Sequence, residues 1–362
     1  MKLSICVVTC YKQPDYVRAI SLRDGVRQSG RFSAVWIVKN RRTGILRYAE
    51  VTLRLMMLRL TKNPDVYLLT FRGYELLPVL LLIAAGKKVV YDEFINPYEW
   101  FVYEHKKFSE RSLPARLLRG VFRWCGMRVT AIVADTPSHA DYSATLMGLP
   151  RALYHSIPVS TDEATFYPQA PTEHEGFQVL YYGNMLPLHG VQYVIEAAEL
   201  LADDSSVTFR IVGGKQAVAE RVKAAAVRGA RIEYTPWVPY AELPALFRSS
   251  DLCLGGPFGG TLQSQFIVTG KSYQFLAAAR PVIIGANKES AAFCDKHDAL
   301  IVPQADARAL AEAIRWAKAH PAQLARIAQN GRTLYESMYS TRRVADELRR
   351  LFTAEHGFDM EG

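Results

Sequence analysis

Three glycine-containing segments in the second half of the chain have the composition of loops that hold a phosphate group. They span residues 183–190, 213–215 and 255–261, and each follows a short apolar run. Glycine lets a ligand approach the backbone closely, and a helix that begins after such a loop presents free N–H groups. Lys271, at the start of a further helical stretch, would add a cation beside such groups. This combination favours a diphosphate, although each loop alone is also typical of an ordinary turn and a single lysine of an open surface.

Acidic residues follow a strand-like run in the first half of the chain. Asp92 ends this run and could accept the proton of an acceptor hydroxyl group, with Glu93 or Glu99 as alternatives. The sequence is equally compatible with another role, in which one of these acids caps the following helix. Arg72 also lies just past a strand-like run, and we predict that it binds a phosphate of the acceptor, together with Tyr11. Alternatively, Arg72 is an ordinary surface residue.

Strand-like and helical stretches alternate along nearly the whole chain. Short runs rich in β-branched residues are separated by segments of helical period, such as residues 191–201 and 307–319. Two sets of six such runs predict two doubly wound α/β domains, each with a parallel sheet covered by helices on both faces. The predicted strands are Leu3–Thr9, Ala34–Lys39, Val66–Thr70, Lys88–Asp92, Ala131–Ala134, Ala152–His155, Gln178–Tyr182, Phe209–Val212, Ile232–Tyr234, Leu252–Leu254, Val282–Ile284 and Leu300–Val302.

The candidate residues lie in the loops where ligands of such sheets bind, beyond the carboxyl ends of the strands. A Pro-rich polar stretch at residues 167–173 predicts the boundary between the domains. We therefore expect a first Rossmann-like domain of residues 1–168 that binds an acceptor. A second Rossmann-like domain, residues 169–340, would face it across a cleft. The C-terminal helix, residues 341–362, is expected to pack back toward the first domain.

Composition excludes several classes of protein. Of 362 residues, 49% are apolar and 22% are charged, so the chain can form substantial cores and is not disordered. The longest apolar stretch, residues 76–85, is half as long as a membrane span, and residues 1–9 read as a strand rather than a signal peptide. The five cysteines have no metal-ligand spacing with histidine and indicate reduced core thiols of a cytosolic protein.

Charge is divided unevenly between the two halves. Residues 1–160 carry 24 Lys and Arg against 12 Asp and Glu, a net +12, whereas residues 161–362 carry 20 against 23, a net −3. This asymmetry indicates an anionic partner for the first half. Between residues 100 and 128, basic residues alternate with Trp, Phe and Leu, as on helices that bind anionic membranes. A core helix with a basic edge is one alternative, and nucleic-acid binding, for which no motif is present, is another.

Four motifs in the second half occur in the order found in the donor-binding domain of glycosyltransferase family 4. They are the strand–Gly–turn entry at residues 182–190, the glycine pair at 212–214, the Val-Pro to Ser-Asp run at 238–251 and the segment 271–283. The resemblance covers roughly residues 130–340 by motif and the rest by architecture. Members of this family are retaining enzymes that use nucleotide sugars and have the GT-B fold, in which two Rossmann-like domains face each other.

The chain departs from the family pattern at four positions. Asn184 and His189 lie where the family usually has Arg and Lys, and Phe266 and Gln274 fall on the two glutamates of its Glu-x7-Glu motif. His189 can still donate to a phosphate and Gln274 can still bond a ribose hydroxyl, whereas Phe266 cannot replace a carboxylate. The sugar would then be held by Thr261 or by backbone N–H groups beside it. The predicted donor-binding residues are Gly183, Asn184, His189, Gly213, Gly214, Trp237, Val238, Gly259, Gly260, Thr261, Lys271 and Gln274.

The resemblance implies a hexosyltransferase of the kind that builds bacterial polysaccharides and glycoconjugates. It would move a sugar, with retention, from a nucleotide diphosphate sugar to a phosphorylated or lipid-linked glycan. No cofactor or metal is expected, because helix N-termini and Lys271 would neutralise the phosphates. We expect a cytoplasmic protein, with the basic first half favouring attachment to the inner face of the plasma membrane, and no nucleic-acid partner. The alternatives are an inactive GT-B binding or partner subunit and a nucleotide-sugar epimerase.

Overall fold

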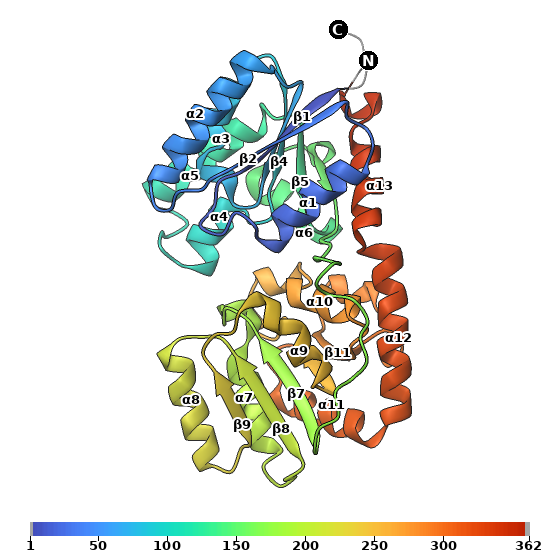
Figure 1. Ribbon diagram of the computed structural model, residues 1–362. Helices are drawn as coiled ribbons and strands as arrows, with labels where there is room; N and C mark the ends of the chain where they lie inside the picture. The colour runs from blue at the N-terminus through green and yellow to red at the C-terminus, as the bar shows by residue number, and fades with distance from the viewer. Residues whose placement is uncertain (1–2, 359–362) are drawn as a thin grey trace. The chain divides into compact units, whose positions relative to one another are not determined.

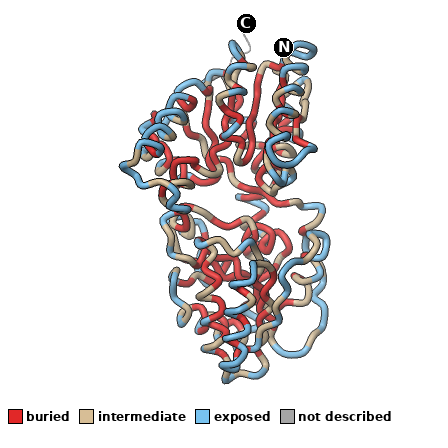
Figure 2. The backbone as a smooth tube through the Cα atoms, turned by 90° about the vertical axis from the view of Figure 1, so that its left-hand side faces the viewer, coloured by how far each residue is buried: buried red, intermediate tan, exposed pale blue. Residues whose placement is uncertain are grey.

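The computed structural model describes residues 3–358, which form two compact units. The first unit comprises Met1–Ser160 together with Thr341–Gly362, and the second comprises Thr161–Ser340. Each unit contains one six-stranded parallel sheet with helices packed on it (Figure 1). In both units the central strands are buried, and the helices carry many of the exposed residues (Figure 2).

The first sheet has the strand order β2-β1-β3-β4-β5-β6. Helices α1 and α13 pack against one side of it, and α2, α3, α5 and α6 pack against the other. In chain order the elements are β1 (Ser4–Thr9), α1 (Val17–Gln28), β2 (Ala34–Lys39), α2 (Leu46–Thr61), β3 (Val66–Thr70), η1 (Gly73–Glu75), α3 (Leu77–Ile83), β4 (Lys88–Asp92), α4 (Pro97–Glu99), η2 (Trp100–Glu104), α5 (Leu113–Gly126), β5 (Ala131–Ala134), α6 (Pro137–Met147), η3 (Arg151–Leu153), β6 (Tyr154–Ser156), α13 (Thr341–Leu351) and η8 (Ala354–His356).

The second sheet has the order β12-β11-β10-β7-β8-β9, so the chain changes direction across the sheet at β7. Its elements are β7 (Phe177–Tyr182), η4 (Pro187–His189), α7 (Val191–Leu200), β8 (Val207–Val212), α8 (Gln216–Val227), β9 (Ile232–Thr235), η5 (Tyr240–Glu242), α9 (Leu243–Arg248), β10 (Leu252–Leu254), η6 (Gln263–Gln265), α10 (Gly270–Ala277), β11 (Val282–Gly285), η7 (Glu289–Ala292), β12 (Leu300–Val302), α11 (Ala307–Ala319) and α12 (Pro321–Met338).

The prediction of two doubly wound parallel sheets is confirmed. All twelve predicted strands are present, with some ends shifted by one or two residues. The central strands are largely apolar because strands of a parallel sheet covered on both faces have no side exposed to water, whereas the edge strand β9 alternates half-buried and exposed residues. In β3, for example, every residue from Val66 to Thr70 is buried. Among residues 3–358, every helix is too short or too polar to cross a membrane.

The division between the units differs from the predicted boundary after residue 168. The second unit already begins at Thr161, because the Pro-rich segment that follows is attached to it by a buried aromatic side chain. Phe166 is 1% exposed, and its ring stacks on that of Phe247 with centroids 5.3 Å apart. Further along, Thr172 N donates to the backbone oxygen of Arg248. A proline-rich composition indicated a linker, but it could not reveal this anchor.

Helix α13 belongs to the first unit and packs along α1. Val344, Leu348 and Leu351 lie in one apolar cluster with Leu22 of α1. The two helices approach closely at Gly25, where a Cβ atom would lie 2.6 Å from Val344 Cγ1 and 2.9 Å from Leu348 Cδ1. Any larger residue at this position would push the helices apart. The C-terminal helix therefore completes the core of the first unit.

Leu348→Ala should lower the free energy of unfolding of the first unit by about 2–5 kcal/mol, because it leaves a cavity between α1 and α13. Urea denaturation followed by circular dichroism measures this change. Arg350→Ala, on the exposed side of the same helix, is the control and should change stability by less than about 0.5 kcal/mol. Equal effects of the two substitutions would show that α13 is not part of the core.

Candidate functional site

Residues predicted to bind a diphosphate gather at the carboxyl ends of β7, β8 and β10. β7 lies between β8 and β10, so the direction in which the chain crosses the sheet changes at β7. A crevice at such a switch point is the usual ligand site of doubly wound sheets. Gly183 follows β7, Gly213 follows β8, and the loop after β10 leads to Lys271 at the start of α10.

Two of the predicted glycines are required because backbone segments meet there. A Cβ atom on Gly213 would lie 2.2 Å from the backbone oxygen of Gly183, and one on Gly259 would lie 2.1 Å from that of Pro187. Gly259 N also donates a 2.9 Å hydrogen bond to the backbone oxygen of Leu188. These contacts join the loops after β7, β8 and β10. The predicted loops therefore form one structure rather than three separate turns.

Lys271 and His189 direct unpartnered nitrogen atoms to the backbone of Gly183. A Cβ atom on this glycine would lie 3.3 Å from His189 Nδ1 and 3.9 Å from Lys271 Nζ. Both nitrogens are buried and have no hydrogen-bond partner in the described part of the chain. The Lys271 amine lies 3.7 Å from the centroid of the Tyr181 ring, and its residue is only 6% exposed.

Burial controls the protonation of this nitrogen pair. It holds the pKa of Lys271 well below its ordinary value. It also lowers the pKa of His189 to about 3, and the nearby charge of Lys271 adds to this effect. Burying an amine without a partner costs free energy, so natural proteins usually provide one. An anion beside Gly183 would supply the missing partner for both side chains.

Two helices begin beside these residues without a side-chain cap. Helix α7 starts at Val191 after Gly190, and α10 starts at Gly270; neither N-cap side chain accepts a hydrogen bond from the first turn. Their first N–H groups are therefore available to an anionic ligand. Together with Lys271 and His189, they give this edge of the sheet the chemistry of a phosphate site.

Gln274 lies between the end of β7 and η5. Its side chain is buried, and its Oε1 accepts a hydrogen bond from the Tyr182 hydroxyl. Its Nε2 lies 3.5 Å from the Tyr240 hydroxyl. The amide oxygen thus contacts the end of β7, and a hydrogen bond from Gln274 to a ribose stays a prediction. Phe266, on the other altered glutamate position, is buried under the Lys288 side chain.

The other predicted donor residues follow the carboxyl ends of strands in the same sheet. Trp237 is 72% exposed and, like Val238, follows β9. β9 lies two strands away from β7 in the sheet, which is a distance of about 10 Å. Thr261 Oγ1 accepts from Ser264 N and so stabilises its own loop. The remaining members are Asn184 and Gly260, which are exposed, and Gly214, which is half-buried.

In the first unit, Asp92 is part of a fully buried ion pair with Arg18. Its Oδ1 accepts from Arg18 Nη2 at 2.8 Å and from Nε at 3.0 Å, and its Oδ2 accepts from Phe71 N at 3.0 Å. Burial raises the pKa of the Asp92 carboxyl, and the Arg18 guanidinium opposes this. With both oxygens occupied and no solvent access, Asp92 does not fit the predicted role of a base. It holds the turn after β3 instead.

That turn presents Arg72 among aromatic rings. Phe71 and Arg72 have φ angles of 22° and 48°, which are unfavourable for residues with side chains and recur at functional sites. The Arg72 guanidinium lies 4.5 Å from the Trp100 ring centroid and 5.4 Å from that of Tyr11. The structure thus brings together Arg72 and Tyr11, the two residues predicted to bind the acceptor.

Glu93 and Glu99 are also buried and belong to a cluster around His139. His139 Nδ1 lies 2.6 Å from Asp135 Oδ1. Burial alone would lower the pKa of His139, but the carboxylates of Asp135, Glu99 and Glu93 raise it to about 9. Burial raises the pKa of Glu99 to about 7. Both glutamates lie within this buried cluster, and the role of either as a base stays a prediction.

Sequence reasoning missed Arg18, Trp100 and the Asp135–His139 pair. The pair directly follows β5, so the rule that ligands meet the carboxyl ends of strands could have drawn attention to it. Arg18 lies in the first turn of α1, where an arginine is usually exposed, and no local pattern indicates its burial. Trp100 was assigned to a membrane-binding stretch rather than to the surroundings of Arg72.

Comparison with known proteins gives a family match for part of the chain and a fold match for nearly all of it. The family model described as "Glycosyl transferases group 1" matches residues 176–319. HepE from Anabaena, crystallised with UDP and glucose, has a TM-score of 0.71 at 14% identity, over 97% of this chain and 100% of HepE. Sucrose-phosphate synthase from Thermosynechococcus elongatus has a TM-score of 0.73 at 14% identity, over 99% and 100% of the chains. No curated protein sequence matches the chain.

A third similar structure is a putative UDP-N-acetylglucosamine 2-epimerase from Listeria monocytogenes, with a TM-score of 0.60 at 14% identity over 99% of this chain and 98% of its own. At such low identity these likenesses concern the fold alone, and they confirm the GT-B class. The family match confirms the resemblance to glycosyltransferases for the segment that contains Gly183, His189 and Lys271. Membership of family 4 and retention stay predictions.

Asp92→Asn should lower the free energy of unfolding of the first unit by about 3–5 kcal/mol, because it leaves the Arg18 guanidinium buried without its counter-charge. Urea denaturation measures the loss. Asp15→Asn, which breaks exposed ion pairs with Lys39 and Arg23, is the control and should cost less than about 1 kcal/mol. An Asp92→Asn protein of unchanged stability whose transfer rate falls about 10²- to 10⁴-fold would restore Asp92 as the base.

Proposed function

We propose that this protein is a glycosyltransferase whose second unit binds a nucleotide diphosphate sugar. The observation that carries the proposal is the pair of buried, unpartnered nitrogens of Lys271 and His189 beside Gly183. They lie within the segment that matches the glycosyl transferases group 1 model. A diphosphate here would accept hydrogen bonds from both side chains and from the first turns of α7 and α10.

Binding of a diphosphate would change the state of Lys271. In the free protein, burial favours the neutral amine. A doubly charged phosphate group within reach would favour the ammonium form, because an opposite charge stabilises it at short range in a low dielectric. The Lys271 side chain would thus gain positive charge when the ligand binds. In this proposal the lysine and the helix N-termini, rather than a metal ion, neutralise the departing diphosphate.

The first unit would bind the acceptor near Arg72. The guanidinium is surrounded by the rings of Tyr11, Tyr74 and Trp100, and aromatic rings are common contacts of sugar faces and of cations. An arginine held in this way suits a phosphorylated or lipid-linked glycan of the kind used in polysaccharide synthesis. Because Asp92 is locked by Arg18, the proton of the acceptor hydroxyl would pass to the leaving phosphate as the glycosidic bond forms. This route is compatible with the retention that the family resemblance implies.

The family match favours transfer over the two alternatives. An epimerase and an inactive binding subunit are compatible with the fold, since the fold is shared with a putative epimerase. A phosphate site would serve all three functions, so the match of residues 176–319 to the glycosyl transferases group 1 model is the observation that favours transfer. Incubation of the protein with UDP-glucose and UDP-N-acetylglucosamine, followed by NMR, separates the three functions. Release of UDP with a glycosylated acceptor supports transfer, a new sugar epimer supports epimerisation, and binding without turnover supports a partner subunit.

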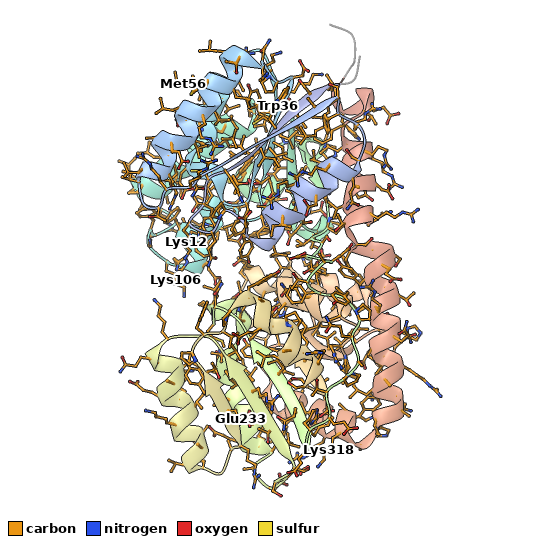
Figure 3. The ribbon with its side chains drawn as sticks, in the orientation of Figure 1. Lys12, Trp36, Met56, Lys106, Glu233 and Lys318 are labelled. Carbon is orange, nitrogen blue, oxygen red and sulfur yellow. The ribbon has the colours of Figure 1, made fainter. Side chains whose placement is uncertain are left out.

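We also propose that the first unit attaches to an anionic membrane through the outer face of α2, α3 and α5. Every exposed large hydrophobic residue in the described part of this unit lies on these helices or next to their ends, and none lies on α1 or α13. They are Ile45, Leu46, Leu53, Met56, Met57, Leu60, Val79, Leu82, Leu113, Leu117, Val121, Trp124 and Met127. Met56, one of these exposed residues on α2, is labelled in Figure 3.

Charge indicates which surface this apolar face would contact. Residues 111–128 contain five arginines and no acid, and α2 contains three arginines and one glutamate. Each basic residue at an anionic lipid surface contributes about 1 kcal/mol. Apolar side chains would enter the interface while the basic side chains contact lipid headgroups. Such attachment would place the protein on the cytoplasmic side of a membrane, next to a lipid-linked acceptor.

Lys271→Met should weaken UDP binding by about 2 kcal/mol, roughly 30-fold, because a charge-assisted hydrogen bond to phosphate is lost. Binding of uridine, which has no phosphate, should change by less than about threefold. Isothermal titration calorimetry measures both, with GDP and guanosine tested in parallel. Lys223→Met, an exposed lysine on α8, is the matched control and should leave both affinities unchanged. Equal losses for nucleotide and nucleoside would reject the phosphate assignment.

Vesicle co-sedimentation should detect binding to phosphatidylglycerol-containing vesicles but not to neutral phosphatidylcholine vesicles. Binding should weaken with salt, since the Debye length falls from about 10 Å at 0.1 M to 3 Å at 1 M. Replacement of Leu60, Leu82 and Leu117 by Ser should abolish it, whereas serine at Leu200, Val227 and Met338, exposed in the second unit, should not. If the first set instead splits a dimer in sedimentation velocity, the face binds a second copy and not a membrane.

A further inference from the structure

Four ionisable side chains of the first unit are buried together at the carboxyl ends of β4 and β5, and we call them the His139 cluster. Glu93 follows β4, Glu99 ends α4, Asp135 follows β5 and His139 lies in the first turn of α6. These residues are only 2–4% exposed. Burial of charged groups costs free energy, so a core that retains four of them requires an explanation.

His139 is the cation of this cluster. Its Nδ1 lies 2.6 Å from Asp135 Oδ1, whereas its Nε2 is buried without a hydrogen-bond partner in the described part of the chain. Asp135 Oδ2 and Glu99 Oε1 are likewise buried and unpartnered there. Burial raises the pKa of both Glu93 and Glu99, and the charge of His139 opposes this rise. Loss of a proton from the cluster would therefore leave uncompensated negative charge inside the unit.

One side of the cluster is carried by the segment that contains Trp100. Asn96 Nδ2 donates to Glu93 Oε1, and Asn96 Oδ1 accepts from Glu99 N, which fixes the start of α4. Trp100 follows Glu99 directly and begins η2, a π-helical turn in which His105 N donates to Trp100 O. Such turns are rare and recur at functional sites.

The same segment reaches the candidate acceptor site. The centroid of the Trp100 ring lies 4.5 Å from Arg72 Cζ. Because Glu99 and Trp100 are neighbours in the chain, a displacement of the Glu99 carboxylate would also displace the Trp100 ring. The charge of the cluster and the geometry around Arg72 are thus connected through two adjacent residues.

The surroundings of the cluster add mainly acids and phenols. They contribute Tyr91 and Asp92 of β4, Glu104 of η2, Tyr142 of α6 and Tyr154 of β6. Asp92 is paired with Arg18. Arg119 of α5 lies over the Tyr98 ring. His139 therefore remains the main counter-charge of the two glutamates.

We propose that Glu99 and His139 are positioning residues, which keep Trp100 beside Arg72 as long as the His139 cluster holds its protons. When the cluster loses protons, repulsion among its carboxylates loosens residues 96–104, and the acceptor site loses the Trp100 ring. The consequence for the acceptor rests on the proposed function of Arg72. The loosening itself depends only on the cluster.

The direction of the pH dependence follows from two pKa values. Burial raises the pKa of Glu99 from its ordinary 4.5 to about 7. Against the effect of burial, the carboxylates of Asp135, Glu99 and Glu93 raise the pKa of His139 from 6.5 to about 9. Both groups hold a proton more tightly in the packed segment than in water, so their contribution to stability is lost as pH rises. The loss from Glu99 falls between about pH 4.5 and 7, and that from His139 between about pH 6.5 and 9.

Hydrogen exchange of residues 98–105 between pH 7 and 8.5, without donor or acceptor, tests the proposal. After division by intrinsic rates, exchange of the wild type should rise roughly three- to tenfold per pH unit, because opening releases about half to one proton. Burial, Lys107 and Arg72 lower the pKa of His105, so this histidine titrates below the range measured.

Glu99→Gln should open less than the wild type at pH 8.5, since an amide cannot ionise. Asp141→Asn, an exposed acid on α6, is the matched control and should follow the wild type at every pH. A wild type whose corrected exchange does not change with pH would overturn the proposal. Greater opening of Glu99→Gln than of the wild type at every pH would also overturn it, because Glu99 would then have only a structural role.

The fluorescence of Trp100, taken as the difference between the wild type and Trp100→Phe, reports on the position of this ring. Its emission should move to longer wavelength between pH 7 and 8.5 in the wild type, and should move less in Glu99→Gln. Unchanged emission together with pH-dependent exchange would contradict the positioning role. Neither measurement uses a nucleotide sugar or an acceptor, so a failure of this proposal is distinguishable from a failure of the proposed transfer activity.

Discussion

The second unit is organised around an amine that is buried without a partner. Lys271 Nζ lies against the Tyr181 ring, next to His189 Nδ1, and neither nitrogen has an acceptor in the described structure. The surrounding backbone is shaped to bring both nitrogens to one place, because Gly213 and Gly259 allow the loops after β7, β8 and β10 to touch. A packed core would replace such an amine by an apolar side chain. We propose that an anionic ligand supplies the missing partner of Lys271.

In this protein, the presence or absence of hydrogen-bond partners distinguishes structural cationic residues from those proposed to bind a ligand. Arg18 donates to Asp92 and to two backbone oxygens, so its buried charge is fully satisfied and serves the fold. Arg72 is half-buried among aromatic rings on a turn that this ion pair supports. Lys271 is buried with an unpartnered nitrogen at the start of α10. The same criterion thus assigns a scaffold role to Arg18 and supports the binding role that we propose for Lys271.

The twelve strands and the glycine-containing loops after β7, β8 and β10 could be predicted because they depend on local sequence. A parallel strand buried on both faces is an apolar run, and a loop at its carboxyl end carries glycines wherever backbones meet. Roles that depend on distant partners could not be predicted. The partner of Asp92 is 74 residues away, Gln274 is held by Tyr182 and Tyr240, and Phe166 attaches a proline-rich segment to the second unit. Each of these contacts exists only after the sheets have formed.

Proton uptake on nucleotide binding tests the central claim most directly. Calorimetric titration of UDP at about pH 8.5, in buffers with different ionisation enthalpies, gives the number of protons taken up. Because burial keeps the pKa of Lys271 well below its ordinary value in the free protein and a phosphate would raise it, the wild type should take up protons. The Lys271→Met protein should take up none. Tight binding of UDP to the wild type with no proton uptake, or with proton release, would contradict the account.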